Sequence, residues 1–424
     1  MKMKDIATFV DKHCQADDYT LYIVKSENLY TRFAQNAITQ HIDGENLQLY
    51  LNVAYDNKTG SAAVNQTDEN SLKKMIDTAQ NIARLNKPDP EFVPSEKAHK
   101  LRELEEPSKA TTELKLEHIV DGIEKCIENA KRKQAKLAGI SHRRIKSTFL
   151  ATKNGFEGYD RQAYFSHSMT MKKGGIETKI ARSLCDYDVF SMDDLITQLN
   201  GQFDSLQEPQ KLEPTRLPVI IRPQALLSVL KYLVWTFQRR EADEGANAFS
   251  DQIGKRFFGE NFSMRSITTD AQLHAPRFDN DGIPTQDIDW IDHGVIKNMQ
   301  TDRSYAKKIG IEPRSIYNLS IDGGNVSERE MMRKVERGLI INSFWYIRPI
   351  DMKAGEWTGL TRDGVLYFEN GKVKQAVYNF RWNEVLHDLT RRILAVGKQK
   401  QIEYDAKVPT LLCDGFNLVD VTTF

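Results

Sequence analysis

Residues 222–258 read RPQALLSVLKYLVWTFQRREADEGANAFSDQIGKRFF, and this stretch decides the fold of the second half of the 424-residue chain. Pro223 suits a first helical turn, where its missing N–H has no partner to lose. Apolar residues then recur with the 3.6-residue period of a helix that packs one face onto a core: Leu226, Leu230, Leu233 and Phe237. Arg239 and Arg240 suit the C-terminal end of a helix dipole. We therefore expect one helix over residues 223–240, after a short strand at 217–221.

The first half of the chain carries the period of antiparallel strands. Apolar and polar residues alternate over 19–23, 29–33 and 47–53, with turns at Asp43-Gly44 and Asn57-Lys58. Further strands are expected at 60–64, 137–152, 164–170 and 176–185, and helices at 4–14, 72–83, 114–130 and 192–206. The proline- and lysine-rich residues 85–112 predict an irregular crossing segment.

From residue 265 onward, short strands alternate with glycine turns, which is typical of a curved antiparallel sheet or barrel. A helix is expected at 384–396 and a last strand at 408–413. The fold class is therefore α+β. We expect an N-terminal antiparallel sheet with helices in residues 1–208 and a β-rich curved-sheet or barrel-like domain in residues 209–424, which contains the 223–240 helix. The segment QEPQKLEP at 207–214 is the expected junction.

Composition excludes several classes of function. The 59 Lys and Arg residues balance the 59 Asp and Glu residues, so a neutral chain offers no electrostatic reason to bind nucleic acid. The longest apolar stretch, near 226–237, is interrupted by Lys231 and is too short to span a bilayer. Four cysteines without a CxxC pair, and no signal-peptide pattern at the N-terminus, favour a cytoplasmic protein with reduced thiols.

Several short motifs, spread over nearly the whole chain, together resemble one family. It is the TldD/TldE (PmbA) family, bacterial proteins once described as modulators of DNA gyrase. The motifs are RFAQNAITQ at 32–40, AFS at 248–250 followed by Ile253-Gly254, FDNDG at 278–282, Gly323-Gly324, a glycine series from Gly359 to Gly371, and Pro409-Thr410-Leu411.

The resemblance implies a zinc-binding helix in the TldD branch, with an HExxxH pattern whose two imidazoles bind Zn²⁺ and whose glutamate activates water. The matching window here is residues 230–235. Leu230 and Trp235 stand at the ligand positions and Lys231 stands at the base position. Because none of them can do that chemistry, the resemblance indicates the TldE-like branch, without a cofactor in this chain and with zinc in a TldD-type partner. Cys413 follows Pro409-Thr410-Leu411, whereas the family's third zinc ligand precedes it, so Cys413 predicts only a buried thiol.

Outside that helix, candidate sites are few. The nine histidines are well separated along the chain, and His274 and His293 flank the turn of Asp279, Asp281 and Gly282. The two histidines could approach each other in space, although structural histidines are the commoner case. The turn does not fit a calcium loop, since Arg277 and Ile288 would hold its first and last ligand positions. A hairpin turn with Gly282 at positive φ accounts for it better. By resemblance, these five residues are expected to line a peptide groove.

We therefore expect a TldE-like, non-catalytic subunit that pairs with a TldD-type zinc metallopeptidase acting on short, unfolded peptides. It would supply one wall of an enclosed chamber, and a strand edge that could hold an extended peptide. Two alternatives stay open. One is a stand-alone peptidase with an atypical metal site built from dispersed His, Asp and Cys413. The other is a homodimeric peptide-binding protein without an enzyme partner.

Overall fold

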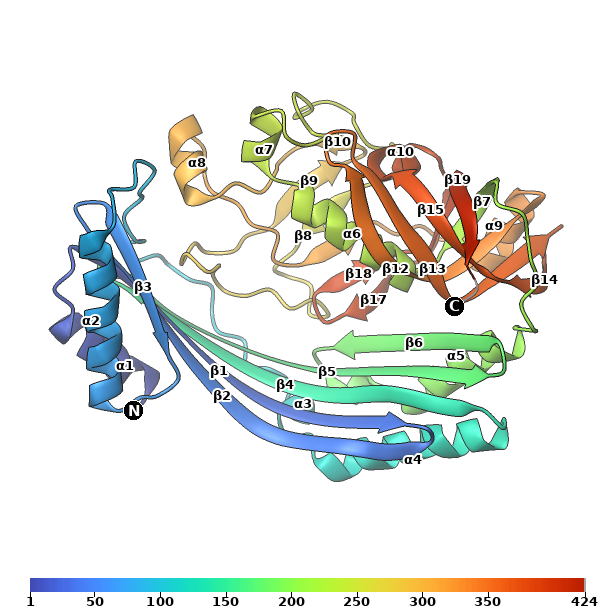
Figure 1. Ribbon diagram of the computed structural model, residues 1–424, viewed down its shortest axis with the longest axis horizontal. Helices are drawn as coiled ribbons and strands as arrows, with labels where there is room; N and C mark the ends of the chain where they lie inside the picture. Colours follow the sequence, from blue (N-terminus) through green and yellow to red (C-terminus); the bar gives the residue numbers. More distant parts are fainter. Residues whose placement is uncertain (423–424) are drawn as a thin grey trace.

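A computed structural model describes residues 1–422, which form three β-sheets with helices on their surfaces (Figure 1). The first sheet has the strand order β3-β2-β1-β4-β5-β6, and every pairing in it is antiparallel. Its strands are β1 (Asp18–Ala34), β2 (Ala37–Tyr55), β3 (Lys58–Val64), β4 (Lys136–Thr152), β5 (Glu157–Lys173) and β6 (Ile176–Leu184). The sheet is strongly curved, and the second half of the chain lies against its concave side.

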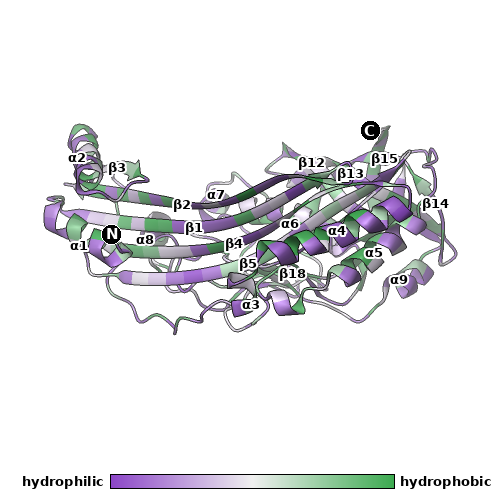
Figure 2. Cartoon of the chain, turned by 90° about the horizontal axis from the view of Figure 1, so that it is seen from below, coloured by the Kyte–Doolittle hydropathy of each residue, from purple (hydrophilic) through white to green (hydrophobic). Residues whose placement is uncertain are grey.

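Alternation along each strand gives this sheet an apolar outer face and a polar inner face. Odd-numbered residues of β1, such as Leu21, Ile23 and Phe33, are buried under helices, while Tyr22 and its even-numbered neighbours point toward the second half of the chain. Figure 2 shows the amphipathic helices lying along the sheet. The helices are α1 (Met3–His13), α2 (Glu69–Leu85), α4 (Leu116–Arg132) and α5 (Met192–Asp204), with the short α3 (Lys109–Thr112) and the 3₁₀ turn η1 (Tyr187–Val189).

Helix α2 begins and packs as its sequence predicts. The Asp68 side chain accepts a hydrogen bond from the Ser71 N–H and so caps the first turn. Gly60 on β3 lies directly under this helix, and a Cβ there would come within 2.3 Å of the Ala79 carbonyl oxygen. Glycine is therefore required at this close approach of strand and helix.

Five strands of the second half follow one another in a ring. They are β7 (Arg216–Ile221), β12 (Arg337–Asp351), β13 (Glu356–Glu369), β15 (Asn379–Val385) and β19 (Leu411–Thr422). β14 (Lys372–Val377) extends the ring beyond β13, and β16 (Ile393–Val396) pairs with β19. Phe344, Trp382 and Phe416 pack against one another in the interior, with ring centroids 5.0–5.7 Å apart. Closure of the ring leaves these strands no free edge between them.

A third sheet, of six short strands, completes the second half. Its order is β10-β9-β8-β11-β18-β17. The strands are β8 (Met264–Ser266), β9 (Ile288–Asp292), β10 (Val295–Ile296), β11 (Leu319–Ile321), β17 (Lys400–Glu403) and β18 (Ala406–Val408). The helices around both sheets are α6 (Pro223–Thr236), α7 (Arg239–Asp243), α8 (Arg303–Ile309), α9 (Glu328–Lys334) and α10 (Leu386–Arg391).

The turn expected at Asp43-Gly44 is wrong, because both residues lie inside the continuous strand β2 and pair with β1. Three expected boundaries in the second half are wrong as well. The helix expected over 223–240 ends at Thr236, and Arg239 and Arg240 belong to the separate α7, because Phe237 turns into the core and its carbonyl oxygen accepts from the Gln300 N–H. The helix expected at 384–396 is only α10, since Glu384 lies in β15. The strand expected at 408–413 is split at Pro409, which has no N–H to continue the ladder, between β18 and β19.

The α+β fold class is confirmed, with the antiparallel N-terminal sheet first and the ring-forming sheets after it. Every strand of the first sheet ends before residue 208, and every strand of the other two begins after it. Whether the two parts are independent folding units stays a prediction. Within residues 1–422, no helix is long and apolar enough to cross a lipid bilayer.

The buried His167 makes a prediction about pH. The side chain lies on the outer face of β5 at 1% exposure, and its Nδ1 is 2.8 Å from the Ser141 hydroxyl. Burial lowers the pKa of His167 from 6.5 to about 4. His167 therefore becomes protonated near pH 6.5 in the unfolded chain, but only near pH 4 in the native state. Stability falls as the pH falls through this window.

We expect His167→Gln, which keeps a hydrogen-bonding side chain and cannot titrate, to remove about 2 kcal/mol of the loss in free energy of unfolding between pH 7.5 and pH 5.0. Urea unfolding at the two pH values measures this loss. His118→Gln, at an exposed position, is the control. An equal loss in wild type and His167→Gln would contradict the assignment.

Candidate functional site

The outward side of α6 overlooks the space between the two halves of the molecule. Leu230 is 3% exposed and belongs to the core under the helix. Lys231 points outward and its ammonium lies 2.6 Å from the Glu403 carboxylate on β17. Trp235 is 57% exposed, and its ring packs edge-on against Trp357 of β13. Neither Leu230 nor Trp235 carries an atom that binds zinc, and the Lys231 ammonium is held in an ion pair. These residues do not fit a zinc site.

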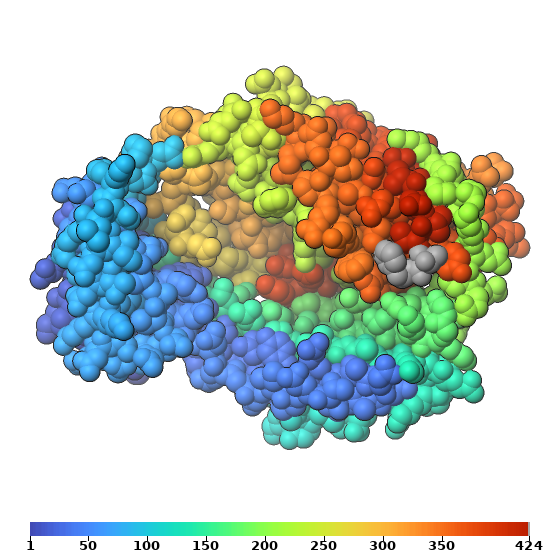
Figure 3. Space-filling model, in the orientation of Figure 1, coloured from blue at the N-terminus to red at the C-terminus, as the bar shows by residue number. Residues whose placement is uncertain are grey.

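A cavity of about 340 Å³ lies between the inner face of the first sheet and the loops of the third. Figure 3 shows the molecule hollowed between these two parts. The sheet supplies the floor and three loops supply the opposite wall. The floor residues are Tyr22, Lys146, Thr148, Asp160 and Gln162, and the wall residues are His274, Pro276, Phe278, Asp279, Asn280, Asp281, Ser315, Ile316, Tyr317, Tyr404 and Asp405.

Tyr404 and Asp405 form the turn between β17 and β18, and this turn connects the cavity to α6. Tyr404 stacks on Tyr164 of β5, with ring centroids 4.2 Å apart and an interplanar angle of 3°. Burial, helped by the charge of the neighbouring Glu403 and opposed by Lys231, raises the pKa of Asp405 to about 6. A carboxyl group that titrates near neutral pH in a cavity is typical of a functional site.

Asp160 and His274 meet at the boundary between this cavity and a second one of about 350 Å³. His274 Nε2 lies 3.8 Å from Asp160 Oδ2. Burial, with the charges of Arg102 and Lys146, lowers the pKa of His274 to about 3, so the imidazole is neutral at pH 7 and this contact is not an ion pair. Burial raises the pKa of Asp160, although its hydrogen bond from the Arg277 N–H opposes the shift. The site therefore buries a neutral imidazole and a carboxyl group beside basic side chains.

The turn at Asp279 has the conformation of a hairpin. Phe278 pairs with Pro284, and the Asp279 carboxylate accepts from the N–H groups of Asp281 and Ile283. Gly282 has φ +94°, where side chains are strained. The preferred interpretation, a turn rather than a calcium loop, agrees with this geometry. Burial raises the pKa values of both Asp279 and Asp281.

His293 does not lie with the other candidate residues. It occupies the turn between β9 and β10, has φ +45°, and contacts the Glu260 carbonyl oxygen through Nδ1. His274 instead faces Asp160, and Cys413 is fully buried in β19. Within residues 1–422, no three His, Cys, Asp or Glu side chains gather as a metal-binding cluster. Of the expected groove residues, the structure brings together His274, Asp279 and Asp281 at the cavity, with Gly282 in the same turn.

Arg102 and Arg277 join the cavity wall to the floor. The Arg277 guanidinium donates to the carbonyl oxygens of Arg102 (2.8 Å) and Tyr159 (2.7 Å). The Arg102 guanidinium donates in return to the carbonyl oxygens of Ala275 and Pro276. The irregular segment 85–112, the sheet and the loop at 275–277 are thereby held to one another.

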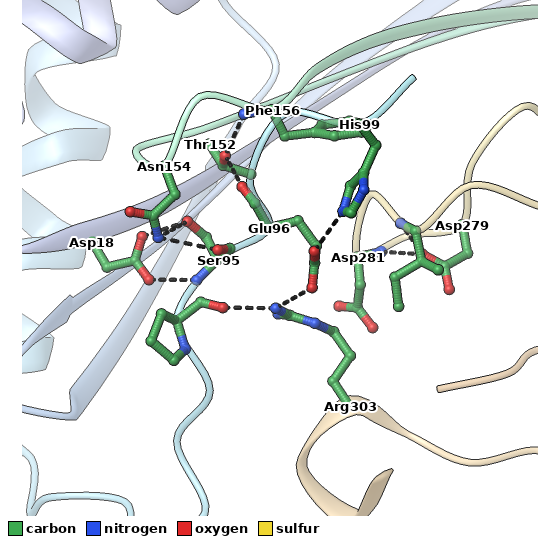
Figure 4. A network of polar contacts seen from close by, with 12 residues as sticks. Asp18, Ser95, Glu96, His99, Thr152, Asn154, Phe156, Asp279, Asp281 and Arg303 are labelled. Carbon is green, nitrogen blue, oxygen red and sulfur yellow. Dashed lines mark hydrogen bonds and ion pairs between the residues drawn. The ribbon is translucent and has the colours of Figure 1, made fainter. Parts of the chain in front are cut away.

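A second polar network fixes the same segment closer to its start (Figure 4). Arg303 of α8 donates to the Pro94 carbonyl oxygen (2.6 Å) and lies 2.5 Å from the Glu96 carboxylate, which also contacts His99 (2.8 Å). Burial alone would raise the pKa of Glu96, but His99 and Arg303 together lower it. In the same network, Ser95 donates to Asp18 at the start of β1. The crossing segment is thus fastened to both halves beside the cavity.

Sequence reasoning missed the floor of this site. Lys146, Asp160 and Gln162 stand on one face of neighbouring strands, and charged or amide residues at every second position were the available signal. Tyr404 and Asp405 gave no signal of their own, since nothing local shows that their turn meets the first sheet.

Comparison with known proteins places the chain in a family. The description "PmbA/TldA metallopeptidase C-terminal domain" matches residues 214–420, and "PmbA/TldA metallopeptidase domain 1" matches residues 19–83. The chain belongs to the PmbA/TldD family.

Relatives and solved structures agree with this assignment. The chain is 24% identical over 378 residues to "Metalloprotease PmbA" of Escherichia coli O157:H7, covering 82% of this chain and 80% of that protein. It is 20% identical over 403 residues to the "Metalloprotease PmbA homolog" of Haemophilus influenzae, covering 86% and 84%. Its fold matches the crystal structure of TldE from Thermococcus kodakarensis with a TM-score of 0.89 over 98% of this chain and 99% of that one, at 17% identity. The resemblance seen in the sequence is confirmed at the level of the family.

Removing the Arg303 guanidinium should loosen the crossing segment. In Arg303→Met the Glu96 carboxylate keeps only His99, which weakens the attachment by about 1–3 kcal/mol. We expect trypsin to cut at Lys97, Lys100 or Arg102 about tenfold faster than in wild type, because cleavage follows the population of the open segment. Arg132→Met, at an exposed residue of α4, is the control. An unchanged cleavage rate would show that the segment does not depend on Arg303.

Asp405 should reduce stability at neutral pH. Its pKa is raised from 3.8 to about 6. Above pH 6 the native state buries a charged carboxylate, which lowers the free energy of unfolding. This destabilisation disappears as the pH falls toward 4, because the carboxyl group becomes protonated in the native state first. We expect Asp405→Asn to raise the free energy of unfolding by about 1–3 kcal/mol at pH 7.5 and to give no gain at pH 4. Denaturant unfolding at both pH values, with the exposed Asp121→Asn as control, measures this. A gain that is equal at both pH values would disprove the raised pKa.

Proposed function

We propose that this chain is a TldE-like, non-catalytic subunit that pairs with a TldD-type zinc metallopeptidase of the same family and acts with it on short, unfolded peptides. The observation that carries the proposal is the outward side of α6. At the window where the resemblance implies two zinc ligands and a base, the chain has a core leucine, an ion-paired lysine and a tryptophan. In the proposed pair, zinc and the water-activating glutamate come from the partner.

The cavity beneath α6 supports a role in holding peptide. Its floor and wall carry hydroxyl, amide and carboxyl groups together with aromatic rings. This mixture suits the polar backbone and varied side chains of a peptide better than it suits a purely apolar ligand. Asp160, Asp279, Asp281 and Asp405 give the cavity more acidic than basic groups. The neutral His274 adds a group that can donate or accept a hydrogen bond at pH 7.

The unpaired part of β2 supports an extended conformation for that peptide. β3 pairs with β2 only over residues 49–55, so in the described chain residues 37–48 have β1 as their single strand neighbour. The opposite edge of the sheet is covered, since Arg182 of β6 donates to the Gln401 carbonyl oxygen of β17. Tyr50 lies beside Tyr22 at the cavity, with ring centroids 6.4 Å apart. Because β3 covers β2 at Tyr50, a peptide that adds a strand to residues 37–48 would lead toward the cavity and end beside it.

The test measures zinc content and peptide hydrolysis for the purified chain, for a purified TldD-type subunit from the same source, and for their mixture. Casein peptides and intact folded lysozyme serve as substrates. We expect no stoichiometric zinc in this chain, and peptide cleavage by the mixture that far exceeds cleavage by this chain alone. Folded lysozyme should remain intact, because it would not enter an enclosed chamber.

Other results would favour the alternatives. Stoichiometric zinc with hydrolysis by the lone chain would overturn the proposal in favour of a stand-alone peptidase. Peptide binding by a homodimer of this chain, with no effect of the TldD-type subunit on binding or hydrolysis, would favour a peptide-binding protein without an enzyme partner.

A further inference from the structure

Two adjacent aromatic residues are exposed on β12, which forms a long hairpin with β13. Figure 1 shows these two strands side by side. Trp345 is 47% exposed and Tyr346 is 53% exposed. The register of β12 against β13 shifts between Trp345 and Arg348, so the strand bulges at this point. Such a bulge re-aims side chains and is often a functional feature.

The backbone at Tyr346 is strained. Its φ is +53°, in the left-handed region that a bulky residue rarely adopts. Such a conformation costs about 1–3 kcal/mol and persists where the surrounding structure imposes it. Because the Tyr346 ring is largely exposed, its burial contributes little free energy to offset this backbone strain. Stability alone therefore does not explain an aromatic residue at this position.

Arginines hold both rings in place. The Arg362 guanidinium lies 4.3 Å from the Trp345 ring centroid, and the Arg348 guanidinium lies 4.6 Å from that of Tyr346. Arg381 of β15 lies in the same row across the sheet as Trp345, with Leu360 between them. We call Trp345, Tyr346, Arg348, Arg362 and Arg381 the aromatic–arginine face. Its rings are ordered before any partner arrives, which lowers the entropy cost of binding.

This face encloses a pocket and carries three arginines, with Asp420 opposite Arg381 in the register of β15 and β19. The pocket has a volume of about 480 Å³ and is lined by Trp345, Tyr346, Leu360, Arg362 and Arg381 among others. Within residues 1–422, Arg348 and Arg381 form no ion pair, and the one carboxylate near Arg362 is Asp363, which is buried and bonded to Ser343. An apolar side chain flanked by carboxylates complements such a surface in shape and charge.

We propose that the aromatic–arginine face docks the TldD-type partner subunit, through a partner segment with an apolar side chain for the pocket and carboxylates for Arg348 and Arg381. The inference rests on the proposed function. Trp, Tyr and Arg are the residues that most often dominate protein–protein binding energy, and arginine binds carboxylates in a bidentate fashion. Single-stranded nucleic acid also uses aromatic and arginine groups, but the chain has zero net charge and the arginines form one patch instead of a track along a backbone.

The test measures the dissociation constant of the purified partner subunit for the wild-type chain and three variants. Arg348→Glu and Arg381→Glu reverse charges that form no ion pair within residues 1–422. Tyr346→Gly removes an anchor ring and also relieves the strained φ, so it should not lower the thermal midpoint. We expect each variant to bind the partner at least about tenfold more weakly while remaining folded. Arg132→Glu on α4, beneath the first sheet, is the matched control and should bind as wild type does.

The outcomes separate the two proposals. If wild type binds the partner and all three variants bind within about twofold of it, the docking face is wrong while the proposed function stands. If wild type does not bind the partner, the proposed function fails and this inference fails with it. Variants that lose self-association or binding to a single-stranded oligonucleotide, with unchanged affinity for the partner, would assign the face to a second copy or to nucleic acid and overturn the inference.

Discussion

The paired guanidinium contacts of Arg102 and Arg277 are the constraint on which the cavity depends. Each arginine donates to backbone carbonyl oxygens of the segment that carries the other, and Arg277 also donates to Tyr159 in the first sheet. Carbonyl oxygens are obligatory acceptors, so losing either guanidinium would remove hydrogen bonds that these oxygens accept, although Pro276 would keep its bond from the Thr285 hydroxyl. The two halves of the chain therefore meet through directional polar bonds, which fix the spacing of floor and wall more closely than apolar packing alone would.

That spacing explains why the polar groups in the cavity have shifted pKa values. The helices bury the apolar outer face of the curved sheet. The polar side chains of its inner face are covered by loops of the second half instead. Covering them removes water, which raises the pKa values of Asp160 and Asp405 and lowers that of His274. The cavity thus holds a neutral imidazole at His274 among carboxyl groups whose pKa values burial has raised, in a setting suited to hydrogen bonds with a peptide.

Two residues have a burial or a backbone conformation that their residue type disfavours, and both lie on surfaces that we propose to be functional. Asp405 buries a carboxyl group that forms no ion pair within residues 1–422, and Tyr346 holds an aromatic residue at positive φ. Such exceptions persist where other interactions impose them. At Asp405 the imposing interaction is the stack of Tyr404 on Tyr164, and at Tyr346 it is the bulge in the ring strand β12.

The sequence by itself determined the antiparallel character of the first half, the helix that starts at Pro223, the hairpin turn at Gly282 and the family, because each of these rests on a local period, a cap or a short motif. The lengths of β1 and β2, which run on through the turn expected at Asp43-Gly44, were decided by pairing between strands. Only the tertiary structure decided where that helix ends, since Phe237 leaves it to fill the core and pair with Gln300. Only the tertiary structure brought Lys146 and Asp160 opposite His274 and Asp405, because contacts between residues more than a hundred positions apart depend on how the sheet curves and how the second half covers it. Periodicity reports which face of a strand is apolar, and it carries no information about what covers the other face.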